Sequence, residues 1–294
     1  MLQSLLPLVA ACGTALAFDR LTDRAGLTPP NFRLDLESTA ALPRAAVLRS
    51  LAMLVLAVVF WVAVFAPLSM LGQGGPIDPA ELTVPQLFFL HVVFVVALLI
   101  WYLLGFAGSG RPLVGSWVEQ FGFRATSIPR EIGIGLIAGV AGWLGVIASL
   151  LLVALAFYLV GGEEAVPSQP PEMIGWVVAL PAAVRALLSL SAGVVEETFF
   201  RGLLQPRAGI ALSTILFVMA HMSYEQAFLL IGVTLLSILF AWLVRWRQNL
   251  WAAITAHTVF DAIQLLIVIP SAMRFLDSAE AGPVALALAW AVGL

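Results

Sequence analysis

Long hydrophobic runs, separated by short polar segments, make up most of this chain. Most runs approach or exceed the roughly 20 residues that an α-helix needs to cross the hydrocarbon core of a bilayer. They predict hydrophobic helices at residues 2–18, 46–71, 84–106, 132–160, 176–205, 209–224, 226–244 and 250–270. The predicted fold class is therefore all-α, a polytopic membrane helix bundle with about eight hydrophobic helices.

The polar segments divide the chain into four regions. Residues 1–45 hold an N-terminal hydrophobic helix and a polar linker, in which Pro29 and Pro30 argue against one continuous helix. Residues 46–172 hold membrane helices of unassigned role, residues 173–270 hold the helices that carry polar groups, and residues 271–294 form an apolar tail. We expect the first helix to be retained, because no basic residue precedes its apolar run as in a signal peptide.

Composition supports an integral membrane protein and excludes several other classes. Apolar residues make up 62% of the 294 residues and charged residues 11%, against about a quarter charged in a soluble domain. The formal net charge is −3, so no basic surface is available for nucleic acid. The single cysteine, Cys12, can form neither an internal disulfide nor a cysteine-rich metal site.

Arginine placement predicts the orientation of the bundle. Loops rich in arginine alternate with loops that carry acids, and cytoplasmic loops are the ones enriched in basic residues. We therefore expect the arginine loops in the cytoplasm, with membrane lipid as a partner and a bacterial inner membrane as the location. The arginines are Arg44, Arg49, Arg111, Arg124, Arg130, Arg207, Arg245 and Arg247, and the acids are Asp78, Glu81, Glu163, Glu164 and Glu172.

Three stretches place ionisable residues inside predicted membrane helices. They are EETFFR at 196–201, FVMAH at 217–221 and HTVFD at 257–261. If Arg207 marks the cytoplasmic surface, Glu196 lies about 16 Å and His221 about 21 Å inside, at 1.5 Å per residue. The same count from Arg247 puts His257 at about 15 Å. Charged groups at such depth usually face a bundle interior or a wet cavity.

The spacing within each stretch predicts which side chains share a helix face. Glu197 and Arg201 are separated by four residues, with the acid first, which is the favoured order for a helical ion pair. Glu196 lies about 100° around the helix from Glu197 and is left to face the cavity. His257 and Asp261 are also four residues apart and share a face.

A carboxylate with two imidazoles in an apolar pocket has two chemical uses. The carboxylate can act as a base toward water, while histidines donate hydrogen bonds to the oxyanion that forms at a carbonyl. Alternatively, Glu196, His221, His257 and Asp261 could hold a zinc ion with an open position for water. His91 lies on a helix without other charged residues, and we interpret it as a packing or interfacial residue.

In this order on successive membrane helices, the three motifs resemble the CPBP family, the CAAX-protease and bacteriocin-processing (Abi) group that includes type II CAAX prenyl endopeptidases. The resemblance covers about residues 173–270 and implies an all-helical intramembrane endopeptidase without a required cofactor. It implies that Glu196 activates water, with Glu197 and Arg201 in support. It also implies that His221 and His257 stabilise the oxyanion and that Asp261 assists, although CAAX endopeptidases typically have asparagine there.

The leading hypothesis is an intramembrane endopeptidase that cleaves a membrane-associated protein or peptide. A zinc-dependent membrane endopeptidase is the alternative mechanism, and a non-enzymatic scaffold or immunity protein with the same fold is the alternative class. A transporter with a proton relay is disfavoured, since the sequence shows no inverted repeat. Nothing in the sequence selects a substrate.

Overall fold

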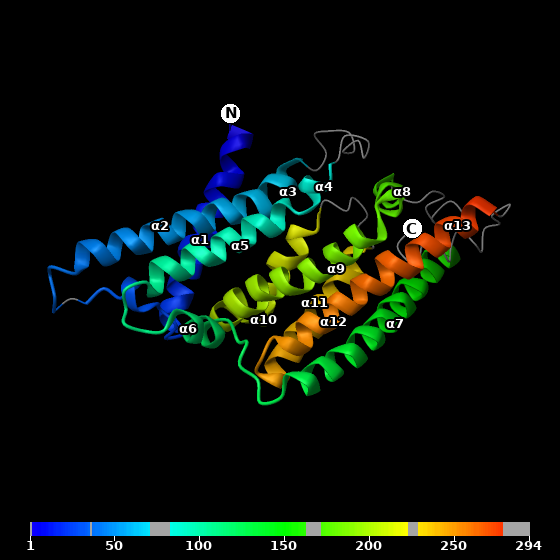
Figure 1. Ribbon diagram of the computed structural model, residues 1–294. Helices are drawn as coiled ribbons and strands as arrows, with labels where there is room; N and C mark the ends of the chain where they lie inside the picture. The colour runs from blue at the N-terminus through cyan, green and yellow to red at the C-terminus, as the bar shows by residue number, and fades with distance from the viewer. Residues whose placement is uncertain (1, 36, 71–82, 163–171, 223–228, 279–294) are drawn as a thin grey trace.

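The computed structural model describes residues 2–35, 37–70, 83–162, 172–222 and 229–278, and these residues contain helices and connecting segments but no strand (Figure 1). The acids Asp78, Glu81, Glu163 and Glu164 and the tail from residue 279 lie outside them. The α-helices are α1 (Leu2–Arg24), α2 (Leu42–Phe60), α3 (Ala66–Met70), α4 (Val84–Leu87), α5 (Phe89–Phe106), α6 (Leu113–Gln120), α7 (Ile128–Gly161), α8 (Glu172–Ala179), α9 (Ala182–Glu196), α10 (Gln205–Ala220), α11 (Leu229–Arg247), α12 (Trp251–Ala262) and α13 (Ile269–Ser278). A 3₁₀ turn, η1 (Pro30–Phe32), and three π-helical segments, η2 (Trp61–Phe65), η5 (Glu197–Leu204) and η7 (Ile263–Val268), complete the list.

The predicted fold class is confirmed. Within the described residues, seven helical segments are long and apolar enough to cross a membrane. They are Leu5–Arg24, Leu42–Ser69, Phe89–Phe106, Ile128–Gly161, Ala182–Ala220, Leu229–Arg247 and Trp251–Arg274.

The 39-residue segment Ala182–Ala220 covers most of the fifth and sixth predicted helices. The fifth was predicted to be continuous from residue 176, but α8 ends at Ala179 and α9 begins at Ala182, after Pro181. The backbone of the segment breaks at Gly209, which has φ 82° and ψ 171°. Ser213 donates to the carbonyl oxygen of Phe200 across 2.7 Å, although 13 residues of continuous α-helix would separate them by about 20 Å. The chain therefore reverses here, and the two arms lie against each other, which reconciles seven continuous segments with eight hydrophobic runs.

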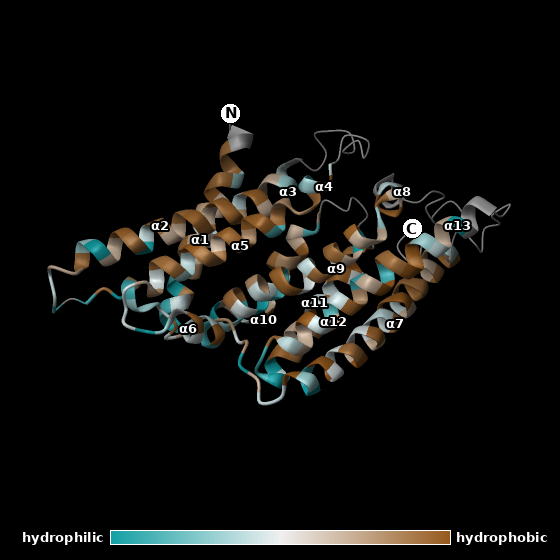
Figure 2. Cartoon of the chain, viewed as in Figure 1, coloured by the Kyte–Doolittle hydropathy of each residue, from teal (hydrophilic) through white to brown (hydrophobic). Residues whose placement is uncertain are grey.

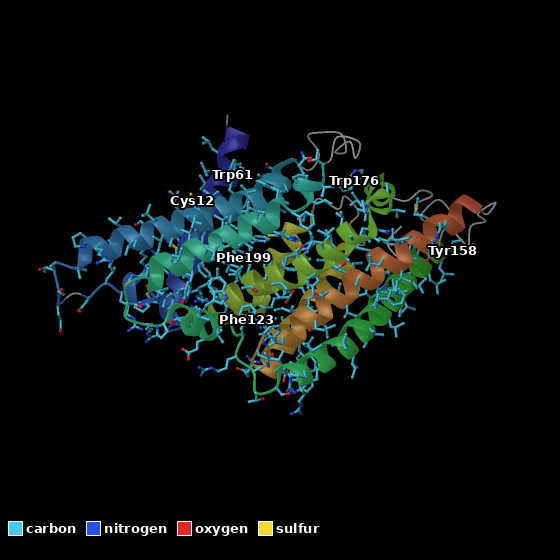
Figure 3. The ribbon with its side chains drawn as sticks, viewed as in Figure 1. Cys12, Trp61, Phe123, Tyr158, Trp176 and Phe199 are labelled. Atoms are coloured by element: carbon cyan, nitrogen blue, oxygen red, sulfur yellow. The ribbon has the colours of Figure 1, made fainter. Side chains whose placement is uncertain are left out.

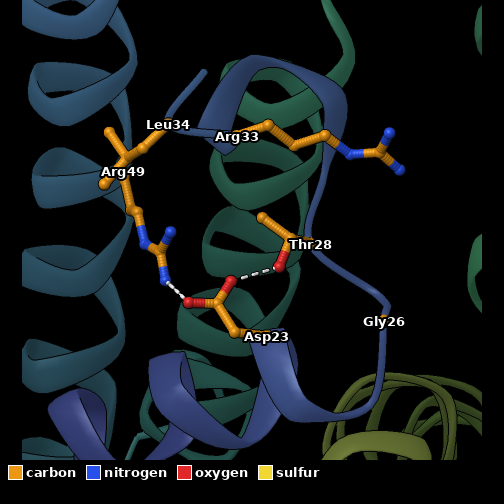
Figure 4. Close-up of a pocket in the computed structure, with 6 residues that line it drawn as sticks. All are labelled: Asp23, Gly26, Thr28, Arg33, Leu34 and Arg49. Carbon is orange, nitrogen blue, oxygen red and sulfur yellow. Dashed lines mark hydrogen bonds and ion pairs between the residues drawn. The ribbon is translucent and has the colours of Figure 1, made fainter. Parts of the chain in front are cut away.

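The first helix is longer than predicted. The sequence placed residues from 19 onward in a polar linker, but α1 continues to Arg24. Arg49 of α2 donates to Asp19 through Nε (2.6 Å) and Nη2 (2.8 Å) and also contacts Asp23, so polar residues in the last turns of α1 have a partner on the neighbouring helix. Asp23 and Arg49 line a surface hollow of about 410 Å³ that contains none of the candidate site residues (Figure 4).

Two clusters of buried side chains organise the bundle. The larger one joins α1, α2, α5, η5 and α10 and is rich in aromatic rings; Phe94 of α5 stacks on Phe199 of η5 with centroids 4.5 Å apart. Figure 3 shows Phe199 inside the bundle, next to α5. The smaller cluster joins α7, α11 and α12. The candidate motifs lie on α9 and η5, on α10 and on α12, and His257 of α12 contacts Phe217 of the larger cluster and Phe240 of the smaller one.

The outside of the bundle is apolar, as a lipid-facing surface requires. Figure 2 shows hydrophobic residues along most of the long helices, with hydrophilic residues concentrated near helix ends. On α7, Ile137 is 74% exposed and Leu152 is 68% exposed. Such residues would be costly in water but are favourable against lipid.

Arg207 is covered by neighbouring helices rather than exposed. Only 5% of it is exposed, and Nη1 donates to the carbonyl oxygen of Leu203 across 2.7 Å. Its guanidinium lies 5.8 Å from the ring centroid of Trp101. The chain reverses two residues later, at Gly209, so Arg207 is covered by neighbouring helices.

Candidate active site

Glu196 is the last residue of α9, and its carboxylate faces two histidines from other helices. Oε1 lies 3.2 Å from Nε2 of His91, and Oε2 lies 3.7 Å from Nε2 of His221. The Glu196 side chain is 12% exposed and that of His221 is 14% exposed. The Glu196 side chain is therefore largely enclosed by the bundle, and its Oε2 atom is buried.

Glu197 serves a different set of partners, as the sequence predicts for adjacent glutamates. Its Oε1 pairs with Nη1 of Arg201 at 3.1 Å, and both side chains are 0% exposed. The same oxygen lies 2.9 Å from Nδ1 of His257. A carboxylate accepts, so the imidazole carries a proton on Nδ1. Glu197 thus aligns His257 as well as holding Arg201, a contact that the sequence analysis missed.

Further contacts fix Arg201 and His257 in place. Nη2 of Arg201 donates to the hydroxyl of Ser237 across 3.0 Å, and its guanidinium lies 4.1 Å from the ring centroid of Phe217. The ring of Phe240 stacks on that of His257 with centroids 4.8 Å apart. A buried charge without such partners would be strongly destabilising. Arg201 is therefore a buried structural cation that holds Glu197 in place.

Asp261 lies one turn after His257 on α12, as predicted. Its Oδ2 is 3.6 Å from Nε2 of His257, which is too long for a direct hydrogen bond, and its side chain is 24% exposed. Both ring nitrogens of His257 therefore face carboxylate oxygens, one close and one at a distance. The gap beside Nε2 is where a further acceptor could approach the ring.

His221 caps α10 and packs on the aromatic residue of its own motif. Nδ1 lies 2.7 Å from the carbonyl oxygen of Phe217, and the two rings have centroids 4.5 Å apart. A carbonyl only accepts, so Nδ1 carries a proton and Nε2 is the nitrogen directed at Glu196. The spacing of four residues in FVMAH produces this geometry directly.

Small residues let the helices that carry these groups approach each other. A Cβ on Gly193 of α9 would lie 2.8 Å from the carbonyl oxygen of Ile254 on α12, and one on Gly139 of α7 would lie 2.8 Å from that of Ala256. Close backbone approach at small residues is typical of membrane helix interfaces. Both α7 and α9 therefore press on α12 within a turn or two of His257.

The π-helical geometry of η5 is a second local feature of the site. It begins at Glu197, directly after Glu196, and runs to Leu204 with every residue buried. π-Helical turns are rare and occur frequently at functional sites. The wider π-helical turn begins at Glu197, so the two adjacent glutamates lie on either side of its start and contact different partners.

His91 belongs to the site, and the interpretation of it as a packing or interfacial residue was wrong. It lies near the start of α5, is 8% exposed, and contacts Glu196 through Nε2 and the hydroxyl of Ser191 through Nδ1. All three histidines of the 294-residue chain therefore contact Glu196 or Glu197. That scarcity was the only signal in the sequence, because 105 residues separate His91 from its partner.

The predicted zinc donors are not arranged as a metal site. Among the described residues, no group of three or more His, Cys, Asp or Glu side chains could hold a metal ion. Nδ1 of His257 is directed at Glu197 and Nδ1 of His221 at a carbonyl oxygen, so Nε2 is the nitrogen of each ring that would be available to a metal.

Comparisons with known proteins match the part of the chain that holds these groups. Residues 178–263 match the family model described as "Type II CAAX prenyl endopeptidase Rce1-like". The chain is 36% identical over 77 residues to the uncharacterized protein YpbD of Bacillus subtilis (strain 168), a match that covers 26% of this chain and 41% of that protein. No solved structure is significantly similar.

All six candidate positions lie within the matched region: Glu196 on α9, Glu197 and Arg201 on η5, His221 at the end of α10, and His257 and Asp261 on α12. His91 lies outside it. Residues 178–263 are a domain of the Rce1-like type II CAAX prenyl endopeptidase (CPBP) family, within a larger bundle of membrane helices.

Proposed function

We propose that this protein is an intramembrane endopeptidase that hydrolyses a peptide bond of a membrane-associated protein or peptide in a bacterial inner membrane. Membership of a protease family and seven apolar helices support the general class. One observation carries the specific mechanism: His221 lies beside the carboxylate of Glu196, and His257 lies beside the adjacent carboxylate of Glu197.

Glu196 acts as the base. Oε1 is held by His91, whereas Oε2 is buried and has no hydrogen-bond partner in the described structure. Oε2 takes a proton from water, and the hydroxide attacks the carbonyl carbon of the scissile peptide bond to form a tetrahedral oxyanion. Glu196 then returns the proton to the leaving nitrogen, the C–N bond breaks, and the carboxylate is regenerated.

His221 and His257 stabilise the oxyanion. Donors aimed in advance at the developing charge contribute most in an enclosed, low-dielectric site. Glu197 holds Nδ1 of His257, so Nε2 is the nitrogen that faces the substrate, beside Asp261. For both rings the donor form is the imidazolium, since Nδ1–H is already donated, by His257 to Glu197 and by His221 to Phe217. Asp261 assists by orienting the ring of His257. It does not bind the oxyanion itself, because an ionised carboxylate cannot donate a hydrogen bond.

The test compares cells that carry the wild type with cells that carry Glu196→Ala. New protein termini in membrane and secreted fractions that appear only with the wild type name the substrate. Glu119→Ala is the matched control, since Glu119 is 55% exposed and pairs only with exposed Arg124. We expect the control to cleave like the wild type and Glu196→Ala to remain folded but inactive.

Purified protein with a peptide that spans the identified site separates the alternatives. Full cleavage by Glu196→Ala would remove the mechanism. Loss of cleavage on treatment with a chelator, with restoration by zinc, would instead support a metal enzyme despite the geometry. Identical terminus profiles for the wild type and Glu196→Ala would favour a non-enzymatic role.

A further inference from the structure

A chain of three polar side chains runs from α9 across to α5 and back to the base. Oγ of Ser191 lies 2.9 Å from Nδ1 of His91, and Nε2 of His91 lies 3.2 Å from Oε1 of Glu196. Ser191 and Glu196 belong to the same helix, and His91 comes from α5, which is outside the matched family domain. The unassigned N-terminal half of the bundle therefore reaches the reacting group.

The proton positions follow from what each group can donate. An ionised carboxylate only accepts, so contact with Oε1 requires a proton on Nε2 of His91. The Ser191 hydroxyl also lies 3.0 Å from the carbonyl oxygen of Leu188, and its one proton serves one acceptor at a time. When it points to Nδ1, the neutral ring is held as the tautomer with its proton on Nε2, which is the form that donates to Glu196.

The two oxygens of Glu196 differ as a result. Oε1 has a donor, whereas Oε2 is buried without a hydrogen-bond partner and lies 3.7 Å from His221. A carboxylate free to rotate would exchange these oxygens, and its base oxygen would lie in the wrong place part of the time. A donor on one oxygen removes that freedom, which is the purpose of orientation in catalysis.

We propose that His91 is a positioning residue that aims Glu196, with Ser191 setting the orientation and tautomer of its ring. This inference rests on the proposed function, because it assigns Glu196 the role of base. It makes α5 part of the active site, and it predicts that the domain defined by residues 178–263 is inactive without the N-terminal helices. His91 does not touch substrate; it acts through Glu196.

The kinetic arm uses purified full-length protein and a peptide spanning the cleavage site found by terminus comparison. His91→Leu should lower kcat by about 10- to 100-fold with KM unchanged, as expected when a group that orients a catalytic residue is removed. His91→Gln should recover much of the activity, because its amide can donate in place of Nε2. Val92→Leu is the matched control on the same helix, since Val92 is 57% exposed toward lipid.

The spectroscopic arm does not depend on cleavage. Ring-¹⁵N-labelled histidine gives signals from only three imidazoles, each assigned by substitution. Glu196→Gln should shift the Nε2 resonance of His91, and Ser191→Ala should shift its Nδ1 resonance. A merely structural contact would not combine these shifts with a fall confined to kcat.

The outcomes separate the two proposals. Unchanged His91 resonances in Glu196→Gln, or wild-type kcat in folded His91→Leu, would overturn the positioning role while leaving the protease function intact. Coupled resonances with no cleavage by wild type would count against the protease function alone. Labelling of Ser191 by a fluorophosphonate, with Ser191→Ala as inactive as Glu196→Ala, would overturn the proposal by making Ser191 a nucleophile.

Discussion

The buried pair of Glu197 and Arg201 allows a prediction of its stability contribution. Both side chains are 0% exposed, with Oε1 and Nη1 3.1 Å apart. Glu197→Gln keeps the size of the side chain but leaves the Arg201 charge uncompensated, and breaking a buried pair in this way typically costs about 3–5 kcal/mol. Arg201 keeps its Ser237 bond and its contact with the Phe217 ring, so we expect the lower end, about 3 kcal/mol.

The assay is thermal unfolding of the purified protein in a mild detergent, followed by tryptophan fluorescence. A loss of about 3 kcal/mol corresponds to a fall in apparent Tm of about 6–12 °C. Glu197→Gln combined with Arg201→Gln should cost less than the sum of the two single changes, because neither charge is left alone. The exposed pair of Glu119 and Arg124 is the control, and Glu119→Gln should change stability by less than about 1 kcal/mol.

Two results would refute this reasoning. One is a Glu197→Gln protein that unfolds at the wild-type temperature. The other is strict additivity of the two single changes, which would show that the pair is not coupled. The double variant should still lack cleavage even where its stability recovers, because the glutamine amide can accept from Nδ1 of His257 but carries no negative charge to stabilise the imidazolium.

Two further predictions test the packing around the site. Gly139→Ala should lower the apparent Tm and the folded yield, since its Cβ would lie 2.8 Å from the backbone oxygen of Ala256. Gly145→Ala on the same helix is the control and should be neutral or slightly stabilising, because its Cβ would meet nothing within 4 Å. Equal effects at both positions would contradict the packing argument. Glu131→Gln should destabilise by about 1.5–3 kcal/mol, because it weakens two hydrogen bonds of 2.6 and 2.8 Å from Arg247, and thermal unfolding should rank it between Glu119→Gln and Glu197→Gln.

Local features of the site were predictable because spacing along a helix determines them. Glu197 and Arg201 pair as their separation of four residues predicts, and the same spacing places Asp261 beside His257. Each of these contacts needs only the geometry of one helix. The hydrophobic runs likewise predict the helices, because the length of a membrane span is set by the bilayer.

Long-range contacts were not predictable from one sequence. The link between His91 and Glu196 joins positions 105 residues apart, and the link between Glu197 and His257 joins positions 60 residues apart. Helix packing creates both, and no local pattern encodes it. The burial of Arg207 likewise depends on helix packing, because the chain reversal covers this side chain with neighbouring helices.

The reversal at Gly209 makes the position of the site depend on the lengths of the two helical arms that it joins. Glu196 lies 13 residues before this glycine and His221 lies 12 residues after it, so two arms of nearly equal length return both groups to the same height. One residue inserted into either arm would lift its end by about 1.5 Å and swing it by about 100°. Sequence between these two groups can therefore vary in composition far more freely than in length.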